Sequence, residues 1–555
     1  MTASSETRVL SIVDVSGIQR YIFGANRLRD NIGASQLVEQ VMTNWLEEAL
    51  PAPHNFTGAT IGPETLDTHP SLRADVIASG GGNVVLLLRG NDTEDALTTA
   101  RATVRRLSRW LLEQAPGLEI VVAHQPFDWQ RDPIGGPDGV YQQLFAELDQ
   151  AKRRAPASSP LLGLGVAREC SSTGLPAVTR FDYAWGSDSG RSDIQPLSAD
   201  ARSKVDFQVI TRADQRMRTV LGIDDSWRIP HELDDLGRSH GEESYIAVVH
   251  ADGNRLGQRF QAVLGSHPTA AENRACLSAL RALSQAVERA GREAFASTVQ
   301  ALLATMDAGD PQQDTPLGRL VRDLQPGMWG RRMLPLRPLI FGGDDLTLVC
   351  DGRLGLGLAA RYLREFERTA AGLPGGPAHA CAGVAVVKSH YPFARAYWLS
   401  EQLCKNAKDE VRADDQPALD WQFATTGISG NLKVLRKRIY GSRVGDLTMR
   451  PVALHNGTNS FGWRRWSNLT SLMGTFSSTR HWPTNKLAAL REVLRNGTPA
   501  VGEWRVRFKD GALLPTLTVG ADAGAQQALT TGGWSGERCG YFDAIEALDF
   551  FIELK

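Results

Sequence analysis

The chain has 555 residues, more than one ordinary hydrophobic core holds, so two to four domains are expected. Its 42% hydrophobic and 22% charged residues are typical of a globular protein, and no run approaches the roughly 18 continuous apolar residues of a membrane helix. The net charge of -1 gives no bulk attraction to nucleic acid, and six scattered cysteines without a signal peptide favour the reducing cytoplasm over secretion or a zinc ribbon.

The first stretch of the chain alternates strands and helices. The predicted elements are a strand ending at Asp14, helices within 17–50, a hairpin at 74–88, a helix at 93–114, a strand at 118–126 and a helix ending near 155. The hairpin turn has the sequence GGGN at 80–83. These elements predict one unit over residues 1–160.

The same order of elements returns later in the chain. The predicted elements are a strand ending at Asp252, a long helical region, a hairpin at 336–350, a helix at 354–370, a strand at 379–392 and a closing helix at 392–412. Two short echoes accompany this order: HQPF at 124–127 against HYPF at 390–393, and Ala-Lys at 151–152 against 407–408. Together they predict an internal repeat.

The repeated unit predicts the fold class. Strand-helix-helix-strand-strand-helix-strand is a ferredoxin-like, palm-type arrangement, so we expect an α+β protein with two palm domains of the GGDEF/cyclase type. The first palm is degenerate, because its turn is GGGN where the second has GGDD. The expected domains are the first palm at 1–160, a small linking domain at 161–238, the catalytic second palm at 239–427 and a mainly helical domain at 428–555.

The second hairpin turn carries the candidate catalytic residues. In a palm the first strand lies beside the hairpin, so Asp252 is expected to face Asp344 and Asp345 across one strand spacing, roughly 5 Å. Three such carboxylates can hold two Mg²⁺ (or Mn²⁺) ions about 4 Å apart, the arrangement used for in-line phosphoryl transfer. A solvent-exposed acidic turn without a metal is the alternative interpretation.

Glycines around these aspartates predict a close approach of nucleotide. Gly342 and Gly343 carry no Cβ, so a phosphate or a sugar can pack against their backbone. Gly253 and Asn254 open a strand-to-helix turn whose amide groups can also approach a phosphate.

Four further side chains are candidates for nucleotide binding. Lys405 and Lys408 lie three residues apart on one face of the closing helix and can neutralise a triphosphate. His390 and Tyr391 can line a base or ribose pocket. A solvated helix face and a structural histidine are the alternatives for these two pairs.

The ordered motifs resemble a known family. They are DVSGIQRYIF at 14–23, SGGGN at 79–83, ADGNRLG at 251–257, FGGDD at 341–345, CAGVAVVKSHYPF at 381–393 and LCKNAK at 403–408. Over roughly residues 8–425 the chain is similar to the palm polymerase/cyclase large subunit of type III CRISPR effector complexes, the Cas-ten family (Csm/Cmr large subunits). The resemblance implies that GGDD makes cyclic oligoadenylates from ATP. It also implies that Asp252, Asp344 and Asp345 ligate the metals, and that Lys405 and Lys408 contact the triphosphate.

Three departures limit what the resemblance implies. The chain starts at the first palm and has no His-Asp dipeptide, so the HD nuclease domain of many relatives is not expected. The linking segment lacks the paired cysteines that bind zinc in many relatives, and Asn254 stands where an aspartate is common. The expected partners are nucleoside triphosphates, and the resemblance adds guide or target RNA and other CRISPR subunits.

The sequence thus predicts an enzyme. The leading hypothesis is a Mg²⁺-dependent nucleotidyltransferase that joins ATP or other nucleoside triphosphates into cyclic oligonucleotide second messengers for antiviral defence. One alternative is a cyclic dinucleotide synthase of the GGDEF type. Another is a non-catalytic scaffold subunit that binds RNA and protein in a CRISPR effector complex.

Overall fold

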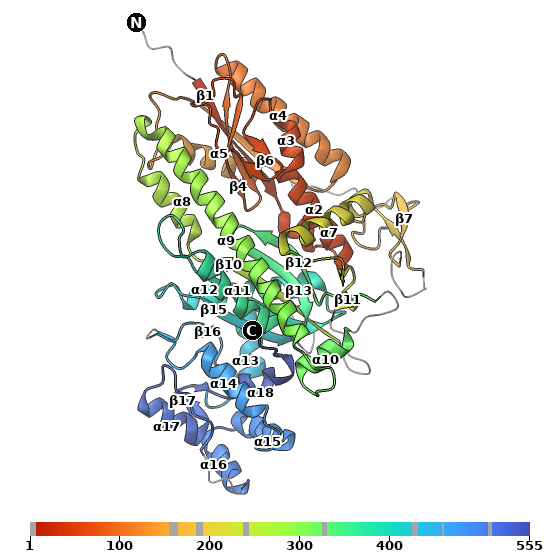
Figure 1. Cartoon of the computed structure of the whole chain (residues 1–555), viewed down its shortest axis with the longest axis vertical. Coiled ribbons are helices and arrows are strands. Elements are labelled where there is room, and N and C mark those ends of the chain that lie inside the picture. The colour runs from red at the N-terminus through yellow and green to blue at the C-terminus, as the bar shows by residue number, and fades with distance from the viewer. Residues whose placement is uncertain are drawn as a thin grey trace.

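The computed structural model describes residues 7–154, 165–184, 192–236, 244–324, 330–424, 431–457, 460–508 and 513–555. Two sheets lie one above the other along the long axis of the molecule, and the blue C-terminal helices lie below the second sheet (Figure 1). The yellow segment that links the two sheets in sequence lies to one side. Among the described residues, none of the helices is long and apolar enough to cross a bilayer.

The first sheet has four antiparallel strands in the order β4-β5-β1-β6. Its strands are β1 (Thr7–Ser16), β4 (Ala74–Gly80), β5 (Asn83–Arg89) and β6 (Glu119–Asp128), with the short pair β2 (Phe56–Thr57) and β3 (Thr60–Ile61) beside it. Its helices are α1 (Ile18–Phe23), α2 (Leu28–Met42), α3 (Asn44–Ala49), α4 (Thr93–Gln114) and α5 (Val140–Arg154). The amphipathic pattern predicted at 93–114 is confirmed as α4.

The second sheet has six strands in the order β12-β13-β10-β14-β15-β16. They are β10 (Tyr245–Gly253), β12 (Leu336–Gly342), β13 (Asp345–Asp351), β14 (Ala380–Lys388), β15 (Ala418–Ala424) and β16 (Val452–Ala453). The accompanying helices are α8 (Leu256–Gly265), η2 (Ala270–Glu272), α9 (Asn273–Asp307), α10 (Pro316–Asp323), α11 (Gly355–Thr369) and α12 (Phe393–Glu410).

The first four strands of the second sheet repeat the first sheet. In both, the hairpin lies beside the first strand and the last strand pairs on its other side. Both hairpins close on a matching pair, Gly80 with Asn83 and Gly342 with Asp345, and both have a register shift at the same distance before the turn. The predicted fold class, α+β with two palm units, is confirmed.

One predicted correspondence between the two palms, that of the His-x-Pro-Phe segments, is wrong. His124 lies inside β6 opposite Ser11 of β1, whereas His390 follows the end of β14. In the common register Asp14 faces Val121 and Asp252 faces Cys381, so His124 corresponds to a residue in the middle of β14. The two His-x-Pro-Phe segments are therefore similar in sequence without being structurally equivalent.

The remaining elements belong to the linking segment, which packs on both palm units, and to the C-terminal part. The linking segment contains β7 (Thr179–Asp182), β8 (Ile194–Leu197), α6 (Ala199–Lys204), α7 (Phe207–Leu221), β9 (Trp227–Arg228) and η1 (Leu233–Asp235), and β9 pairs with β11 (Arg332–Met333). The C-terminal part contains α13 (Leu432–Tyr440), α14 (Trp466–Phe476), α15 (Thr484–Arg495), α16 (Thr498–Arg507), α17 (Ala523–Gly532), β17 (Trp534–Ser535), β18 (Arg538–Cys539), α18 (Phe542–Ala547) and η3 (Leu548–Phe550). Because β16 pairs with β15, the second sheet extends past the boundary predicted at 427; the domain boundaries stay a prediction.

The central strand β10 separates two hydrophobic clusters. Alternate residues point to opposite faces of a strand. Accordingly, Ala247 and Val249 pack in the cluster that contains α9 and α11, while Ile246 and Val248 pack in the cluster that also contains β1, α1 and α12. The second cluster is shared by both palm units, so one continuous core fixes the first palm against the second.

Candidate active site

The predicted aspartates meet at one end of the second sheet. Asp252 is the next-to-last residue of β10, and Asp345 is the first residue of the neighbouring strand β13. Asp344 lies in the turn that joins β12 to β13 and interacts directly with Asp252. The strand order that the palm arrangement predicted therefore brings these three side chains together.

The two hairpin turns differ in backbone conformation. In the first palm both central residues, Gly81 and Gly82, have positive φ, at 58° and 83°. In the second palm Gly343 has a φ of 64°, while Asp344 at the next position does not have a positive φ. Two-residue hairpin turns with positive φ at the first position alone accept an ordinary residue at the second. This conformation allows a carboxylate to occupy the tip of the second turn.

Burial and mutual repulsion make this a strained carboxylate cluster. The pKa of Asp345 is raised to about 8, chiefly by burial and then by the charges of Asp252 and Asp344. The pKa of Asp344 is raised to about 6, again by burial first and then by Asp252. Buried Tyr362 on α11 also has a raised pKa, with burial and then these same carboxylates as the causes. The site thus disfavours the ionised forms of its own carboxylates.

Lys408 is the cation inside this cluster. Its ammonium contacts the carboxylate of Asp252 and donates to the carbonyl oxygen of Gly253 at 2.7 Å. The pKa of Lys408 is raised, because the attraction of Asp252 outweighs the effect of burial. Lys405, three residues earlier on α12, is exposed to solvent. The structure therefore separates the two lysines, which the sequence treated alike.

Two glycines allow close packing at the turn. A Cβ on Gly253 would lie 2.8 Å from the Cβ of Asp344, so an alanine there would displace the carboxylate. A Cβ on Gly291 of α9 would lie only 1.9 Å from the carbonyl oxygen of Gly343. The sequence analysis missed Gly291, because a glycine inside a helix shows no partner until the fold is known.

The chemistry of the donor set suits a hard divalent cation. The three candidate ligands are carboxylates, the group that Mg²⁺ prefers in proteins. Their oxygens do not all come within 4.8 Å of one another here; among the described residues that spacing is reached by Glu367, His379 and His455. What fits a cation at the aspartates is their raised pKa values, caused by burial first and then by mutual repulsion, because a bound cation would favour the ionised forms that both causes oppose.

A cavity of about 620 Å³ lies beside the GGDD turn. Both hairpin turns line it, through residues 80–82 of the first palm and Gly342 and Asp345 of the second. Arg216, Arg289 and Arg292 also line it. The guanidinium of Arg216 lies 3.1 Å from Glu39 and stacks over Phe341, and Arg292 lies 2.6 Å from Glu288. The sequence analysis missed these arginines, whose ordinary helical setting gave no signal.

The other predicted binding residues lie elsewhere. His390 and Tyr391 follow β14 at the end of the sheet opposite Asp252, roughly 25 Å along the strand, and line a separate cavity. The side chain of His390 is 85% exposed. Asn254 is buried, and its backbone N–H donates to the carbonyl oxygen of His379 at 2.7 Å. The structure therefore does not bring His390 and Tyr391 to the aspartates.

Comparison with known proteins identifies the fold. No protein-family model and no curated protein sequence matches the chain. A crystal structure of the Csm1–Csm4 cassette in complex with pppApA matches with a TM-score of 0.52 and 14% identity, over 98% of this chain and 69% of that one. The Csm1–Csm4 subcomplex of the type III-A CRISPR-Csm interference complex matches with a TM-score of 0.49 and 14% identity, over 99% and 71%.

This chain has the Csm1 fold. Csm1 is the Cas-ten large subunit of type III-A CRISPR complexes, so the resemblance carried by the motifs is confirmed at the level of the fold. The shared fold includes the palm-domain architecture in which Asp252 and the GGDD turn lie on neighbouring strands.

Proposed function

We propose that the chain is a Mg²⁺-dependent nucleotidyltransferase that joins nucleoside triphosphates into cyclic oligonucleotide second messengers. The observation that carries the proposal is the strained carboxylate cluster of Asp252, Asp344 and Asp345 beside a cavity shared by both palm units. Perturbed carboxylates at the wall of a cleft are a physical signature of a functional site.

Asp252, Asp344 and Asp345 are the residues that would hold Mg²⁺ or Mn²⁺. A divalent cation bound there supplies positive charge to the triphosphate and lowers the pKa of an attacking 3′-hydroxyl. Lys408 holds the carboxylate of Asp252 in place and supplies one permanent positive charge next to it. Gly253 keeps the space beside Asp344 free of any side chain of its own.

The cavity provides room for two substrates in one reaction. The donor triphosphate lies against Gly342 and Asp345, where Arg292 and Arg216 can contact its phosphate oxygens. The acceptor lies against the glycine turn at 80–82 of the first palm, which presents backbone to the same cavity. The 3′-oxygen then attacks the α-phosphorus, and pyrophosphate leaves. The first palm, which has no carboxylate cluster of its own, is retained because it forms the acceptor wall.

The proposed substrate is ATP and the proposed products are cyclic oligoadenylates. The support is the resemblance of the GGDD motif to the Cas-ten family and the structural match to a Csm1–Csm4 cassette that binds pppApA. By the same match we propose a Csm4-like subunit as a protein partner, with guide or target RNA as a further candidate. The proposed setting is antiviral defence in the cytoplasm.

The test is direct incubation with nucleotides. The purified chain is mixed with ATP, GTP, CTP and UTP, singly and together, in Mg²⁺ or Mn²⁺, and products are identified by mass spectrometry. We expect cyclic adenylates that disappear in the double variant Asp344→Asn, Asp345→Asn and in Asp252→Asn, and that persist in Asp14→Asn, the first-palm counterpart of Asp252. Unchanged product from the double variant would overturn the site assignment.

A further inference from the structure

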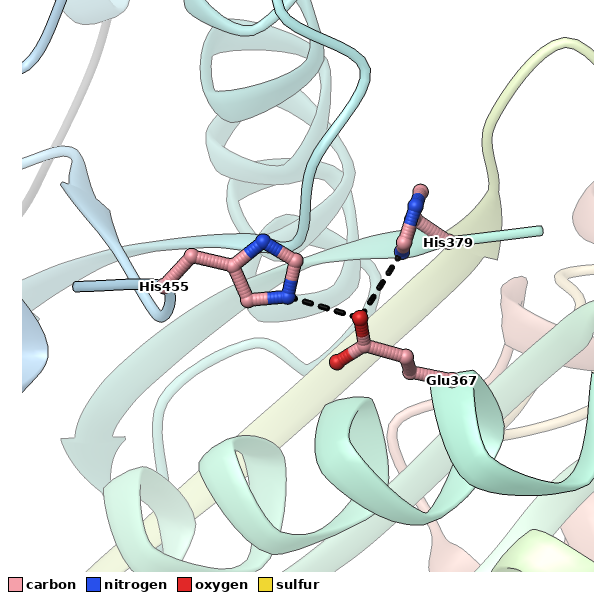
Figure 2. Close-up of side chains that lie close together, drawn as sticks. All are labelled: Glu367, His379 and His455. Carbon is pink, nitrogen blue, oxygen red and sulfur yellow. Dashed lines mark hydrogen bonds and ion pairs between the residues drawn. The ribbon is translucent and has the colours of Figure 1, made fainter. Parts of the chain in front are cut away.

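A second cluster of ligand-type side chains lies outside the cavity. Glu367 comes from α11, His379 immediately precedes β14, and His455 follows β16 (Figure 2). One ligand atom from each residue lies within 4.8 Å of the other two. Three segments that are distant in the sequence therefore converge on one point with two imidazoles and one carboxylate.

The spacing of these atoms matches a metal site. Glu367 Oε1 lies 2.7 Å from His455 Nε2 and 3.4 Å from His379 Nδ1, and Figure 2 shows both rings directed at the same carboxylate oxygen. Two ligands of a tetrahedral zinc ion with bonds of about 2.0–2.1 Å lie about 3.4 Å apart, as Glu367 and His379 do, whereas the shorter hydrogen bond from His455 has to lengthen when a metal binds. The imidazole planes are inclined at 85°, so the rings do not stack and both nitrogens face the carboxylate.

His379 supplies independent evidence for a missing ligand. Its Nδ1 is buried and has no hydrogen-bond partner among the described residues. Its 3.4 Å approach to Glu367 Oε1 does not have hydrogen-bond geometry, so the nitrogen is left for a ligand placed between the two side chains.

We propose that Glu367, His379 and His455 bind a divalent transition-metal ion of the zinc class, with water as the fourth ligand. Two nitrogen donors and one oxygen donor suit zinc better than Mg²⁺ or Ca²⁺. The side chains are 32%, 16% and 39% exposed, so solvent reaches the open coordination position. The site is separate from the carboxylate cluster that the proposed function uses.

The role of the site is to join the C-terminal segment to the catalytic palm. His455 lies beyond β16, whereas Glu367 and His379 belong to the palm itself. The carbonyl oxygen of His379 accepts the backbone N–H of Asn254, two residues after Asp252. A metal on His379 thereby restrains the end of β10 from which the catalytic carboxylate projects.

The test measures metal binding rather than catalysis. The full chain is stripped with a chelator, returned to excess Mg²⁺, and titrated with Zn²⁺ by calorimetry and with Co²⁺ by visible absorption. We expect one equivalent of saturable binding and the intense absorption of tetrahedral Co²⁺. In His455→Ala and Glu367→Gln the affinity should fall at least about 10-fold, because each change removes a ligand.

Three controls accompany the measurement of Zn²⁺ binding. His481→Ala removes an exposed histidine of the C-terminal segment and should leave Zn²⁺ affinity unchanged. The double variant Asp344→Asn, Asp345→Asn should also keep full Zn²⁺ affinity, which separates this site from the proposed catalytic one. Circular dichroism of stripped His455→Ala and Glu367→Gln confirms that both variants fold. Absence of stoichiometric binding, or equal affinity in the parent and both ligand variants, would overturn the proposal.

Discussion

Lys408 contacts the carboxylate of Asp252, and Lys152 lies 2.8 Å from the carboxylate of Asp14 at the matching position of the first palm. Each pair joins the last helix of a palm unit to the end of its first strand. The pairing is therefore a property of the fold, while the aspartates in the neighbouring turn belong to the second palm alone. Asp14 and Lys152 therefore serve as matched controls for Asp252 and Lys408.

Removal of the lysine that pairs with the first-strand aspartate should lower activity in the second palm and not in the first. Lys408→Met leaves Asp252 without its cation beside two other carboxylates, so we expect product formation to fall at least about 10-fold. Lys152→Met breaks the equivalent pair where no such cluster exists and should retain activity. Initial rates of product formation at saturating ATP measure both. Equal losses in the two variants would mean that the lysine supports the fold and not the chemistry.

The carboxylate cluster predicts a pH-dependent stability in the absence of divalent cations. Asp345 has a folded pKa of about 8 against an ordinary value of 3.8, so the folded chain binds this proton more tightly than the unfolded chain. Its contribution to stability is complete below the ordinary value and is lost as pH rises through the folded value. In chelator, Asp345→Asn should therefore raise the melting temperature more at about pH 8 than at about pH 5.

Added Mg²⁺ should oppose that effect. The cation neutralises the ionised cluster of the parent chain at about pH 8, so its melting temperature should rise more than that of Asp345→Asn. Asp138→Asn, at an exposed loop aspartate, should show neither response. A parent and an Asp345→Asn variant with the same pH and Mg²⁺ dependence would contradict the assigned charge state.

Because α9 contacts the GGDD turn at Gly291, an alanine at this position should destabilise the folded chain. In Gly291→Ala the new Cβ meets the carbonyl oxygen of Gly343, and we expect a loss of about 1–3 kcal/mol in unfolding free energy together with reduced activity. Gly474→Ala in α14 places a Cβ with no described atom within 4 Å, and should stabilise by about 0.5–1 kcal/mol. Denaturant unfolding of both variants checks this. A stabilising Gly291→Ala would show that the turn is not held by the helix.

Loss of an arginine that lines the cavity should weaken the binding of ATP. Arg292→Gln removes a charge that we place against the donor triphosphate, so the KM for ATP should rise about 10-fold or more. Arg153→Gln on α5 breaks an ion pair of the same i,i+4 geometry, with Asp149, at a residue that does not line the cavity, and should leave the KM unchanged. Steady-state kinetics over a range of ATP concentrations distinguishes them. A lowered kcat at unchanged KM in Arg292→Gln would instead place Arg292 in the chemical step.

Local sequence signals predicted the palms but not the surface between them. Hydrophobic periodicity and the glycine turns placed the strands, and strand order then brought Asp252 next to Asp344 and Asp345. His390 was misplaced because β14 runs antiparallel to β10, which puts the C-terminal end of β14 at the edge of the sheet away from Asp252. Arg216 and Arg292 were missed because their role depends on packing between units. The Glu367–His379–His455 cluster was missed because its three segments are far apart in the sequence.

The helix α9 spans both palm units. Near its N-terminal end Arg281 pairs with Asp75 and Ser284 donates to the carbonyl oxygen of Ser79, while Gly291 meets the GGDD turn. Seven residues separate Ser284 from Gly291, a rise of about 10 Å. The number of residues between Ser284 and Gly291 in α9 therefore sets the distance between the donor wall and the acceptor wall of the cavity. A single insertion there would turn Gly291 by about 100°, whereas loops elsewhere are free to change length without altering that distance.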